Sequence, residues 1–264
     1  MSEPSSFEPL RPVAPRARLA LGAAFFVVFL LLWAGATLGG LIKPLFLADP
    51  VTTLEAGIRL FSEHGFHEDI GITVFRVVGG FVLAAAIGVP LGIAMGAFKP
   101  IEAFFGPFIS FARYLPASAF IPLLILWAGV GEAQKLLVIF IGSFFQIVLM
   151  VAVIIGETRR DLVEAAYTLG AKSGGIVTRV MLPNAAPQIA ETLRLVLGWA
   201  WTYVIVAELV GANSGIGYMI MDSQRFLDTG QMIFGIFIIG VIGLITDFAF
   251  RAANIALFPW YAGR

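Results

Sequence analysis

The sequence has no cysteine, only two histidines and few charged residues. Without cysteine, disulfides and thiol chemistry are excluded. His64 and His67 share one polar stretch that lacks the acidic or cysteine spacing of a metal site, so we expect an ordinary loop there and no bound metal. Charged residues are 13% of the chain, the formal net charge is zero, and the basic residues are scattered. This pattern excludes a nucleic-acid-binding surface.

What the sequence has in abundance is apolar residues, which make up 59% of its 264 positions. Such a composition is typical of a protein that lies in a lipid bilayer. Apolar stretches of spanning length occur at about 19–40, 71–98, 103–129, 134–156, 187–211 and 231–255. Six spans of about 20 residues leave room only for short loops. We therefore predict an all-α polytopic membrane protein with one transmembrane domain, 19–264, whose core covers about 71–256, behind a tail at 1–18.

The first apolar stretch predicts a retained helix. It carries no charge, is too long for the core of a signal peptide, and follows a proline- and serine-rich tail with arginines at its end. The polar stretch 43–69 comes next. There Asp49-Pro50 resembles a helix start, and Leu54, Ile58 and Phe61 follow at helical spacing. We expect a short amphipathic helix outside the membrane.

Glycines and prolines predict where the spans pack and where they break. Gly88, Gly92 and Gly96 recur every four residues and share one helical face. Close packing of a neighbouring helix is the favoured explanation, and contact with a substrate is the alternative. Pro90 is expected to kink this span. The stretch 103–129 contains Pro107, Pro116 and Pro122, and these three prolines predict a broken helix.

The distribution of basic residues predicts the orientation in the membrane. With six spans both termini lie on one side, and that side carries ten lysines and arginines, against four on the other. Lys/Arg-rich loops face the cytoplasm. We therefore expect cytoplasmic N- and C-termini, a cytoplasmic segment at 157–184, and outer segments at 41–70 and 212–230. In the second outer segment, Asn213-Ser-Gly-Ile-Gly breaks the helix before a short amphipathic piece.

The inner segment 157–184 is too long for an ordinary loop, because connections in helix bundles usually have about 2–8 residues. Asp161-Leu-Val-Glu-Ala-Ala-Tyr-Thr-Leu-Gly-Ala has the pattern of an amphipathic helix that stops at Gly170. A second short helix is expected up to Leu182-Pro183. Such an exposed helical hairpin is small enough to enter a groove on a soluble partner.

This segment resembles the EAA signature of binding-protein-dependent ABC transporter permeases, with valine where isoleucine is commoner. The matching residues are Glu164-Ala165-Ala166, Gly170, Val180, Leu182 and Pro183. Further stretches are similar to the nitrate, sulfonate, taurine and bicarbonate branch of this family: Pro44-Leu-Phe-Leu, Thr73-Val-Phe-Arg76, Pro90-Leu-Gly-Ile-Ala-Met-Gly96, Pro122-Leu-Leu-Ile-Leu-Trp127 and Ala207-Glu-Leu. The resemblance implies a type I importer permease fold, of the MetI-like kind.

The resemblance also implies partners. Glu164, Ala165 and Ala166 would lie against a cytoplasmic ATPase, Gly170 would turn the chain, and Leu182 and Pro183 complete the coupling segment. A large side chain at Gly170 is expected to clash and to strain the turn. The family implies two ATPase subunits, a periplasmic binding protein and a second copy of this chain. We do not expect this chain to be an enzyme that hydrolyses ATP itself, because Gly170-Ala-Lys-Ser lacks the glycine-lysine order and the preceding strand of a phosphate-binding loop. ATP and magnesium would bind the ATPase, and no cofactor this chain.

Polar or bulky groups inside the spans are candidates for the translocation path. They are Arg113, Gln146, Trp199, Trp201, Thr202 and Glu208. Each has an alternative role. Arg113 would snorkel to the inner interface, and the tryptophans would pack between helices. Glu208 would be hydrated near the outer end of a span. Asp247 and Arg251, four residues apart, are interpreted as a structural pair. Arg76 and Arg113 are compatible with an anion path.

The resulting hypothesis is an inner-membrane permease that imports a small solute, such as nitrate, bicarbonate or a sulfonate. The same family offers an alternative in uncharged heterocycles or aromatic acids. An intramembrane hydrolase is disfavoured, because both histidines lie outside the spans and cysteine is missing. An ion-coupled secondary transporter would need intramembrane acids and an internal repeat. Glu208 and Asp247 are the available acids, and no repeat is visible.

Overall fold

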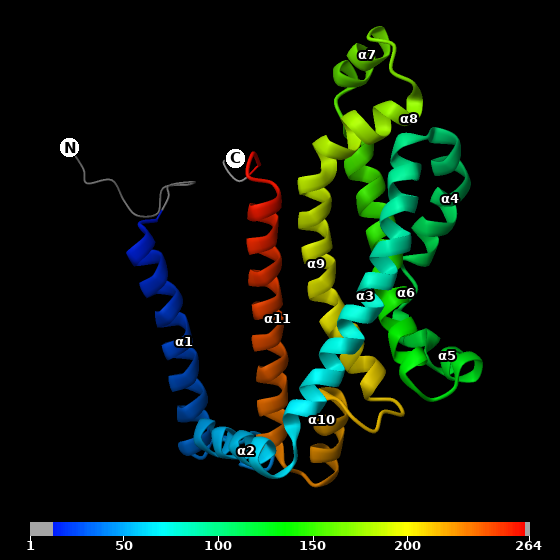
Figure 1. Ribbon diagram of the computed structural model, residues 1–264. Helices are drawn as coiled ribbons and strands as arrows, with labels where there is room; N and C mark the ends of the chain where they lie inside the picture. Colours follow the sequence, from blue (N-terminus) through cyan, green and yellow to red (C-terminus); the bar gives the residue numbers. More distant parts are fainter. Residues whose placement is uncertain (1–12, 262–264) are drawn as a thin grey trace, which may run out of the picture.

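The computed structural model describes residues 13–261, and within that range its regular secondary structure is all helix (Figure 1). Its helices are α1 (Pro15–Leu38), α2 (Pro50–Glu63), α3 (Phe66–Ala97), α4 (Lys99–Ala112), α5 (Ile121–Ala128), α6 (Glu132–Gly156), α7 (Arg160–Thr168), α8 (Ser173–Ile176), α9 (Leu182–Glu208), α10 (Ile216–Arg225) and α11 (Thr229–Leu257), with a 3₁₀ turn at Ala117–Phe120 and a π turn at Val177–Met181. The predicted tail 1–18 lies largely outside the described residues, but α1 begins at Pro15, earlier than expected.

The described residues contain five helices long and apolar enough to span a membrane, or six if a bent pair counts as one. This pair is α4 with the segment Ala117–Ala128, and it bends by 88°. The break lies at Pro116, which follows the end of α4. Pro107 stays inside α4, and Pro122 occupies the first turn of α5, where a missing N–H costs little. The predicted broken helix is confirmed, although only one of its three prolines lies at the break.

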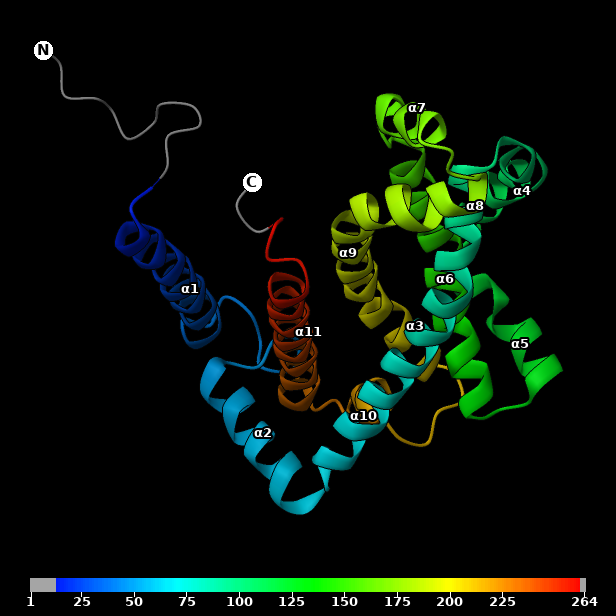
Figure 2. The same ribbon diagram turned by 45° about the horizontal axis from the view of Figure 1, so that its top comes forward.

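Helices α3, α6 and α9 form the centre of the molecule, and α11 runs beside α9 (Figure 1). The N-terminal end of α1, the C-terminal end of α11 and helix α7 lie on one side, whereas α2 and α10 lie on the other (Figure 1). Figure 2 shows the same separation after a rotation, with α7 projecting beyond the ends of α6 and α9. The predicted alternation of the two sides is therefore present in the fold.

The glycine stripe of α3 lies directly against α6. A Cβ atom at Gly92 would be 2.7 Å from the carbonyl oxygen of Val148, and one at Gly96 would be 2.5 Å from that of Ala152. Gly88 faces Ile147 in the same way. Bare backbone at these positions lets two helices approach closely. The packing explanation is thus confirmed, and α3 continues through Pro90 without a break.

Helix α1 lies outside this centre, as predicted. No residue in its most apolar window is buried. Its attachment is near its C-terminal end, where Trp33 stacks on Phe237 of α11 at 5.7 Å and donates its indole N–H to the carbonyl of Ala48 at 3.0 Å. The remaining surface of α1 is apolar and exposed in one copy of the chain, as expected for a helix that faces lipid or another subunit.

Two predicted boundaries are wrong. The second span begins at Phe66 and not at Gly71, so His67 lies in a helix and not in a loop. Glu68 and Asp69 in this first turn favour the helix start. The helix after Gly170 also does not end at Pro183. Residues Ser173–Glu208 form one continuous helix, and a π turn directly before Pro183 accommodates the break in hydrogen bonding that proline introduces.

Candidate translocation pocket and coupling segment

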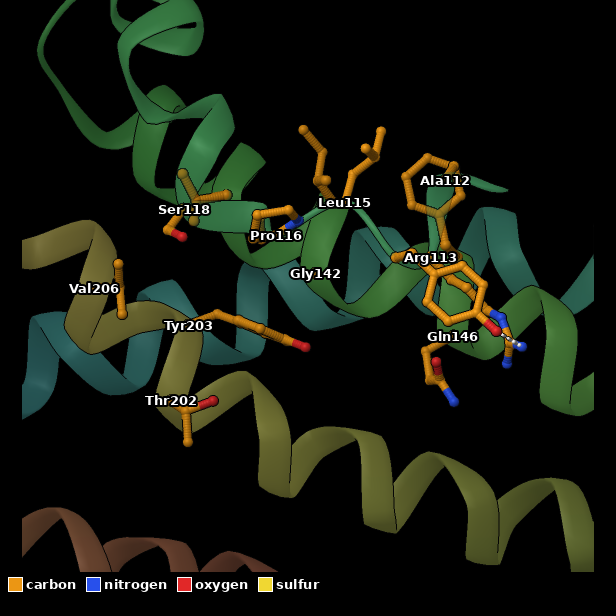
Figure 3. Close-up of a pocket in the computed structure, with 15 residues that line it drawn as sticks. Ala112, Arg113, Leu115, Pro116, Ser118, Gly142, Gln146, Thr202, Tyr203 and Val206 are labelled. Carbon is orange, nitrogen blue, oxygen red and sulfur yellow. Dashed lines mark hydrogen bonds between the residues drawn. The ribbon is translucent and has the colours of Figure 1, made fainter. Parts of the chain in front are cut away.

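A pocket of about 320 Å³ lies at the break between α4 and α5, where the chain bends around Pro116. The bend forms one wall, and α6 and α9 form the others (Figure 3). Because residues 113–116 belong to no helix, the chain can turn here and present consecutive side chains to one space. Arg113, Gln146 and Thr202, three residues predicted to line the path, all border this pocket.

The pocket combines one positive charge with neutral polar groups. The Arg113 guanidinium lies 4.6 Å above the ring of Tyr114 and donates a hydrogen bond of 2.7 Å to that hydroxyl. Gln146, Thr202 and the Tyr203 hydroxyl add donors and acceptors (Figure 3). No aspartate or glutamate is among the residues that line the pocket. An exposed guanidinium without a facing carboxylate is suited to a small anion.

Tyr203 escaped the sequence analysis. It lies next to Thr202 on α9, and its ring also fills the space above Gly142 of α6, where a Cβ would be 2.6 Å away. The neighbouring Thr202 was the available signal, but a tyrosine in an apolar run is usually a packing residue. Its position at the pocket depends on Gly142, which is 61 residues away along the chain, and one sequence does not reveal that pairing.

The two tryptophans do not border the pocket. Trp201 is 4% exposed and donates its indole N–H to the hydroxyl of Thr246 on α11 at 3.2 Å. It packs one helix against another, as the alternative interpretation held. Trp199 is 42% exposed on the same helix.

Glu208 is fully buried and part of an ion-pair network, so the interpretation of a hydrated carboxylate is wrong. Arg76 of α3 donates to Glu208 at 2.8 Å and to Glu132 of α6 at 2.6 Å. The Arg76 side chain is only 1% exposed. An arginine held in this way is not available to a passing anion. Of Arg76 and Arg113, the two arginines considered for an anion path, Arg113 is the one that borders the pocket. We call Arg76, Glu132 and Glu208 the outer ion cluster, after the side of the membrane that the lysine and arginine distribution predicts for it.

The outer ion cluster also holds the start of α10. Glu208 accepts the backbone N–H of Gly217 at 2.8 Å, and Thr73 accepts that of Ile216 at 2.9 Å. These contacts satisfy N–H groups that the first turn of a helix leaves unpaired. A Cβ at Gly215 would lie 2.5 Å from a Glu208 oxygen, and its φ of +107° disfavours other residues. The helix break predicted at 213–217 is present. Its glycine lets the backbone lie close to the buried charges of Glu208 and Arg76.

Asp247 does not pair with Arg251, contrary to the prediction. Arg194 of α9 donates to Asp247 at 2.6 Å and to Glu191 on its own helix. A partner on the neighbouring helix reaches Asp247 with good geometry, and this contact outweighs the four-residue spacing along α11.

The candidate coupling segment, 157–184, is mostly exposed. Helix α7 has no buried residue, and Glu164 and Ala165 are exposed, while Ala166 is partly covered. Its amphipathic face is therefore unpartnered within one chain. At the start of α7, Arg159 donates to Asp161 at 3.1 Å, and this hydrogen bonding lowers the pKa of the Asp161 carboxyl.

Gly170 closes α7 with a Schellman motif. Its φ is +80°, the Ala171 N–H bonds to the Ala166 carbonyl at 3.0 Å, and the Gly170 N–H bonds to the Tyr167 carbonyl at 2.9 Å. The predicted turn and its strain for other residues agree with this geometry. A Cβ placed at Gly170 meets no atom of this chain within 4 Å, so the predicted clash of a large side chain stays a prediction about its contact with a partner. Leu182 packs against the hydrophobic core, whereas Pro183 is exposed.

Comparisons with known proteins agree with this architecture. Residues 88–255 match the family described as binding-protein-dependent transport system inner membrane component. The taurine transport system permease protein TauC of Escherichia coli (strain K12) is 31% identical over 95% of this chain and 92% of its own length. The putative aliphatic sulfonates transport permease protein SsuC of Bacillus subtilis (strain 168) is 35% identical over 84% and 80%. The nitrate import permease protein NrtB of Synechocystis is 28% identical over 76% of each chain.

A solved structure supports the fold. A chain of the MetNI methionine ABC transporter, in an inward-facing conformation, superposes with a TM-score of 0.66 at 19% identity, covering 72% of this chain and 95% of that one. The fold is therefore that of a MetI-like permease. With its multiple apolar helices, the protein is a multi-pass inner-membrane protein of a transport family and not an enzyme family. The chain belongs to the inner-membrane permeases of binding-protein-dependent ABC importers, in the branch of the taurine, sulfonate and nitrate permeases.

Proposed function

We propose that this permease forms the translocation path for a small anion such as nitrate, bicarbonate or a sulfonate, delivered by a periplasmic binding protein. The observation that carries the proposal is the pocket at the Pro116 bend, where the exposed guanidinium of Arg113 faces no lining carboxylate. The names of the similar permeases, which refer to taurine, sulfonates and nitrate, support the same class of solute.

Helix α7 is the proposed contact with a separate cytoplasmic ATPase, which would bind ATP and magnesium and hydrolyse the nucleotide. Glu164, Ala165 and Ala166 would lie in a groove of that subunit, and the Gly170 turn would set the angle at which α7 enters it. Residues 173–208 form one continuous helix, which packs against the core at Leu182 and lines the pocket further along α9. A movement of α7 would therefore pass to a pocket-lining helix. Pro183 would shape the start of this connection.

The proposed assembly is a homodimer in which each chain contributes residues 19–264 as one transmembrane domain behind the tail 1–18. The start of α1, the end of α11 and α7 share one side (Figure 1). The excess of lysine and arginine on that side supports a cytoplasmic location for the termini and for 157–184. The exposed apolar surfaces of α1 and α11 would face lipid or the second copy.

The alternative solutes and mechanisms have less support. An uncharged heterocycle would not need the Arg113 charge in the pocket. An ion-coupled carrier needs an acidic side chain that can release its ion or proton. The two intramembrane acids considered for this role, Glu208 and Asp247, are each hydrogen-bonded to an arginine.

Uptake measurements in cells that carry the permease with its native partners test the proposal. We expect uptake of radiolabelled ethanesulfonate or nitrate and none of uncharged cytosine. Arg113→Gln should raise the KM for the anion by about tenfold, the size of one lost charged hydrogen bond. Arg225→Gln, which removes another exposed arginine, on α10, is the control and should leave the KM unchanged. Uptake of cytosine alone, or an unchanged KM in Arg113→Gln, would contradict the proposal.

A further inference from the structure

A second cavity, of about 280 Å³, lies between α9 and α11 near their ends on the side of α7. It is lined by Pro187, Glu191, Arg251, Asn254, Phe258 and Tyr261, among others. None of these residues borders the translocation pocket, belongs to the outer ion cluster or lies on α7. The transport function described above therefore does not explain this cavity.

The charges around the cavity leave one cation and part of one carboxylate open to a ligand. Arg194 pairs with Asp247 at 2.6 Å and also holds one oxygen of Glu191. The other Glu191 oxygen accepts the Asn254 amide at 3.3 Å and retains capacity for a further donor. Arg251 forms no ion pair among residues 13–261 and its side chain is exposed. The two arginines and two carboxylates sum to zero, so a ligand with both charges suits the cavity better than a simple anion.

The length of α11 indicates that the cavity lies near the depth of lipid headgroups. Helix α11 has 29 residues. It is therefore about 43 Å long, longer than the hydrocarbon core of about 30 Å. If α11 is centred, Arg251 lies eight residues from its midpoint, about 12 Å from the bilayer centre, and the long side chain reaches the headgroup layer. Phe248 and Ile255, on the same helix, are 58% and 52% exposed, as lipid-facing residues are.

We propose that this cavity binds the headgroup of an amine-bearing phospholipid of the phosphatidylethanolamine type. The Arg251 guanidinium would donate to the phosphate oxygens, and the Glu191 carboxylate would accept the primary ammonium. Phe258 and Tyr261 would lie against the glycerol and the first acyl carbons. A purely anionic headgroup would place uncompensated negative charge near Glu191, and a quaternary ammonium would offer it no N–H.

Native mass spectrometry of the purified full-length permease, with the subunits that accompany it, tests this proposal. The protein is loaded with equal amounts of phosphatidylethanolamine, phosphatidylglycerol and phosphatidylcholine, and the retained lipids are counted. The wild type should retain phosphatidylethanolamine about tenfold more than either competitor, the effect of one charged hydrogen bond. Arg251→Gln should abolish this retention, while Arg225→Gln on the opposite side should keep it. Glu191→Gln should retain the three lipids equally.

Equal retention of the three lipids by the wild type, or unchanged selectivity in Arg251→Gln, would overturn the proposal. A further arm adds soluble phosphoethanolamine, which shares the charged groups but has no acyl chains. The lipid assignment requires that a large excess of this solute leaves the lipid bound. Displacement at equal concentration would instead identify the occupant as a water-soluble phosphoamine. In both arms, normal expression and an unchanged unfolding temperature of Arg251→Gln show that the variant is folded.

Discussion

The outer ion cluster and helix α7 both present charged side chains, but in opposite surroundings and at opposite ends of α6 and α9. Arg76 and Glu208 are almost completely buried and bind three helices and the start of α10 together. Helix α7 has no buried residue, and its carboxylate Glu164 is exposed. Buried ion pairs are costly to break, whereas exposed charges contribute little to folding. The comparison separates residues that hold the permease together from residues that are available to a partner.

The largest effect on stability is expected when the outer ion cluster is broken. Glu208→Ala leaves the Arg76 guanidinium buried without one of its two carboxylates and removes the partner of the Gly217 N–H. Removing one member of a buried pair costs about 3–5 kcal/mol. We expect a large drop in folded yield and in the unfolding temperature in detergent. Glu164→Ala on α7 is the matched control, and equal behaviour of the two variants would refute the distinction.

A smaller loss of stability is expected from Gly215→Ala. The added Cβ would press on Glu208 and Arg76, and the φ of +107° is unfavourable for alanine. Overpacking and backbone strain of this kind each cost about 1–3 kcal/mol. The control is Gly174→Ala in α8, where no atom lies within 4 Å of the new Cβ. Thermal unfolding of both variants should show a lower midpoint for the first alone.

A small loss of stability, but a complete loss of transport, is expected from Gly170→Asp. Space is open at this position, and aspartate tolerates a left-handed backbone better than most residues. The variant should therefore reach the membrane in normal amounts. The added carboxylate on the surface that we propose faces the ATPase should abolish uptake. Normal uptake at normal expression would show that the Gly170 turn is not part of the coupling surface.

The sequence predicted the spans and the exposed helix α7, because both depend on local features. Long apolar stretches give the spans, and the pattern from Asp161 to Gly170 gives a helix with a glycine stop. The comparison with known permeases then confirmed the family.

The sequence did not predict the contacts between distant residues. Arg76 meets Glu132 and Glu208 across 56 and 132 residues. Asp247 was assigned to Arg251 on its own helix because local spacing was the available guide, yet Arg194 is its partner. Tyr203 was missed for the same reason, since only the packing of α9 on Gly142 brings it to the pocket. Contacts of this kind depend on how whole helices meet.

The most direct test of the account uses the tagged permease purified from its native membranes in mild detergent. Vanadate-sensitive ATP hydrolysis and the co-purifying subunits are measured for the wild type, Glu164→Arg and Glu63→Arg. Glu63 is an exposed carboxylate on α2, on the side opposite to α7. We predict an associated ATPase with the wild type and with Glu63→Arg, and its loss from a normally folded Glu164→Arg. A single polypeptide that hydrolyses no ATP, or an ATPase retained equally by all three proteins, would contradict the account.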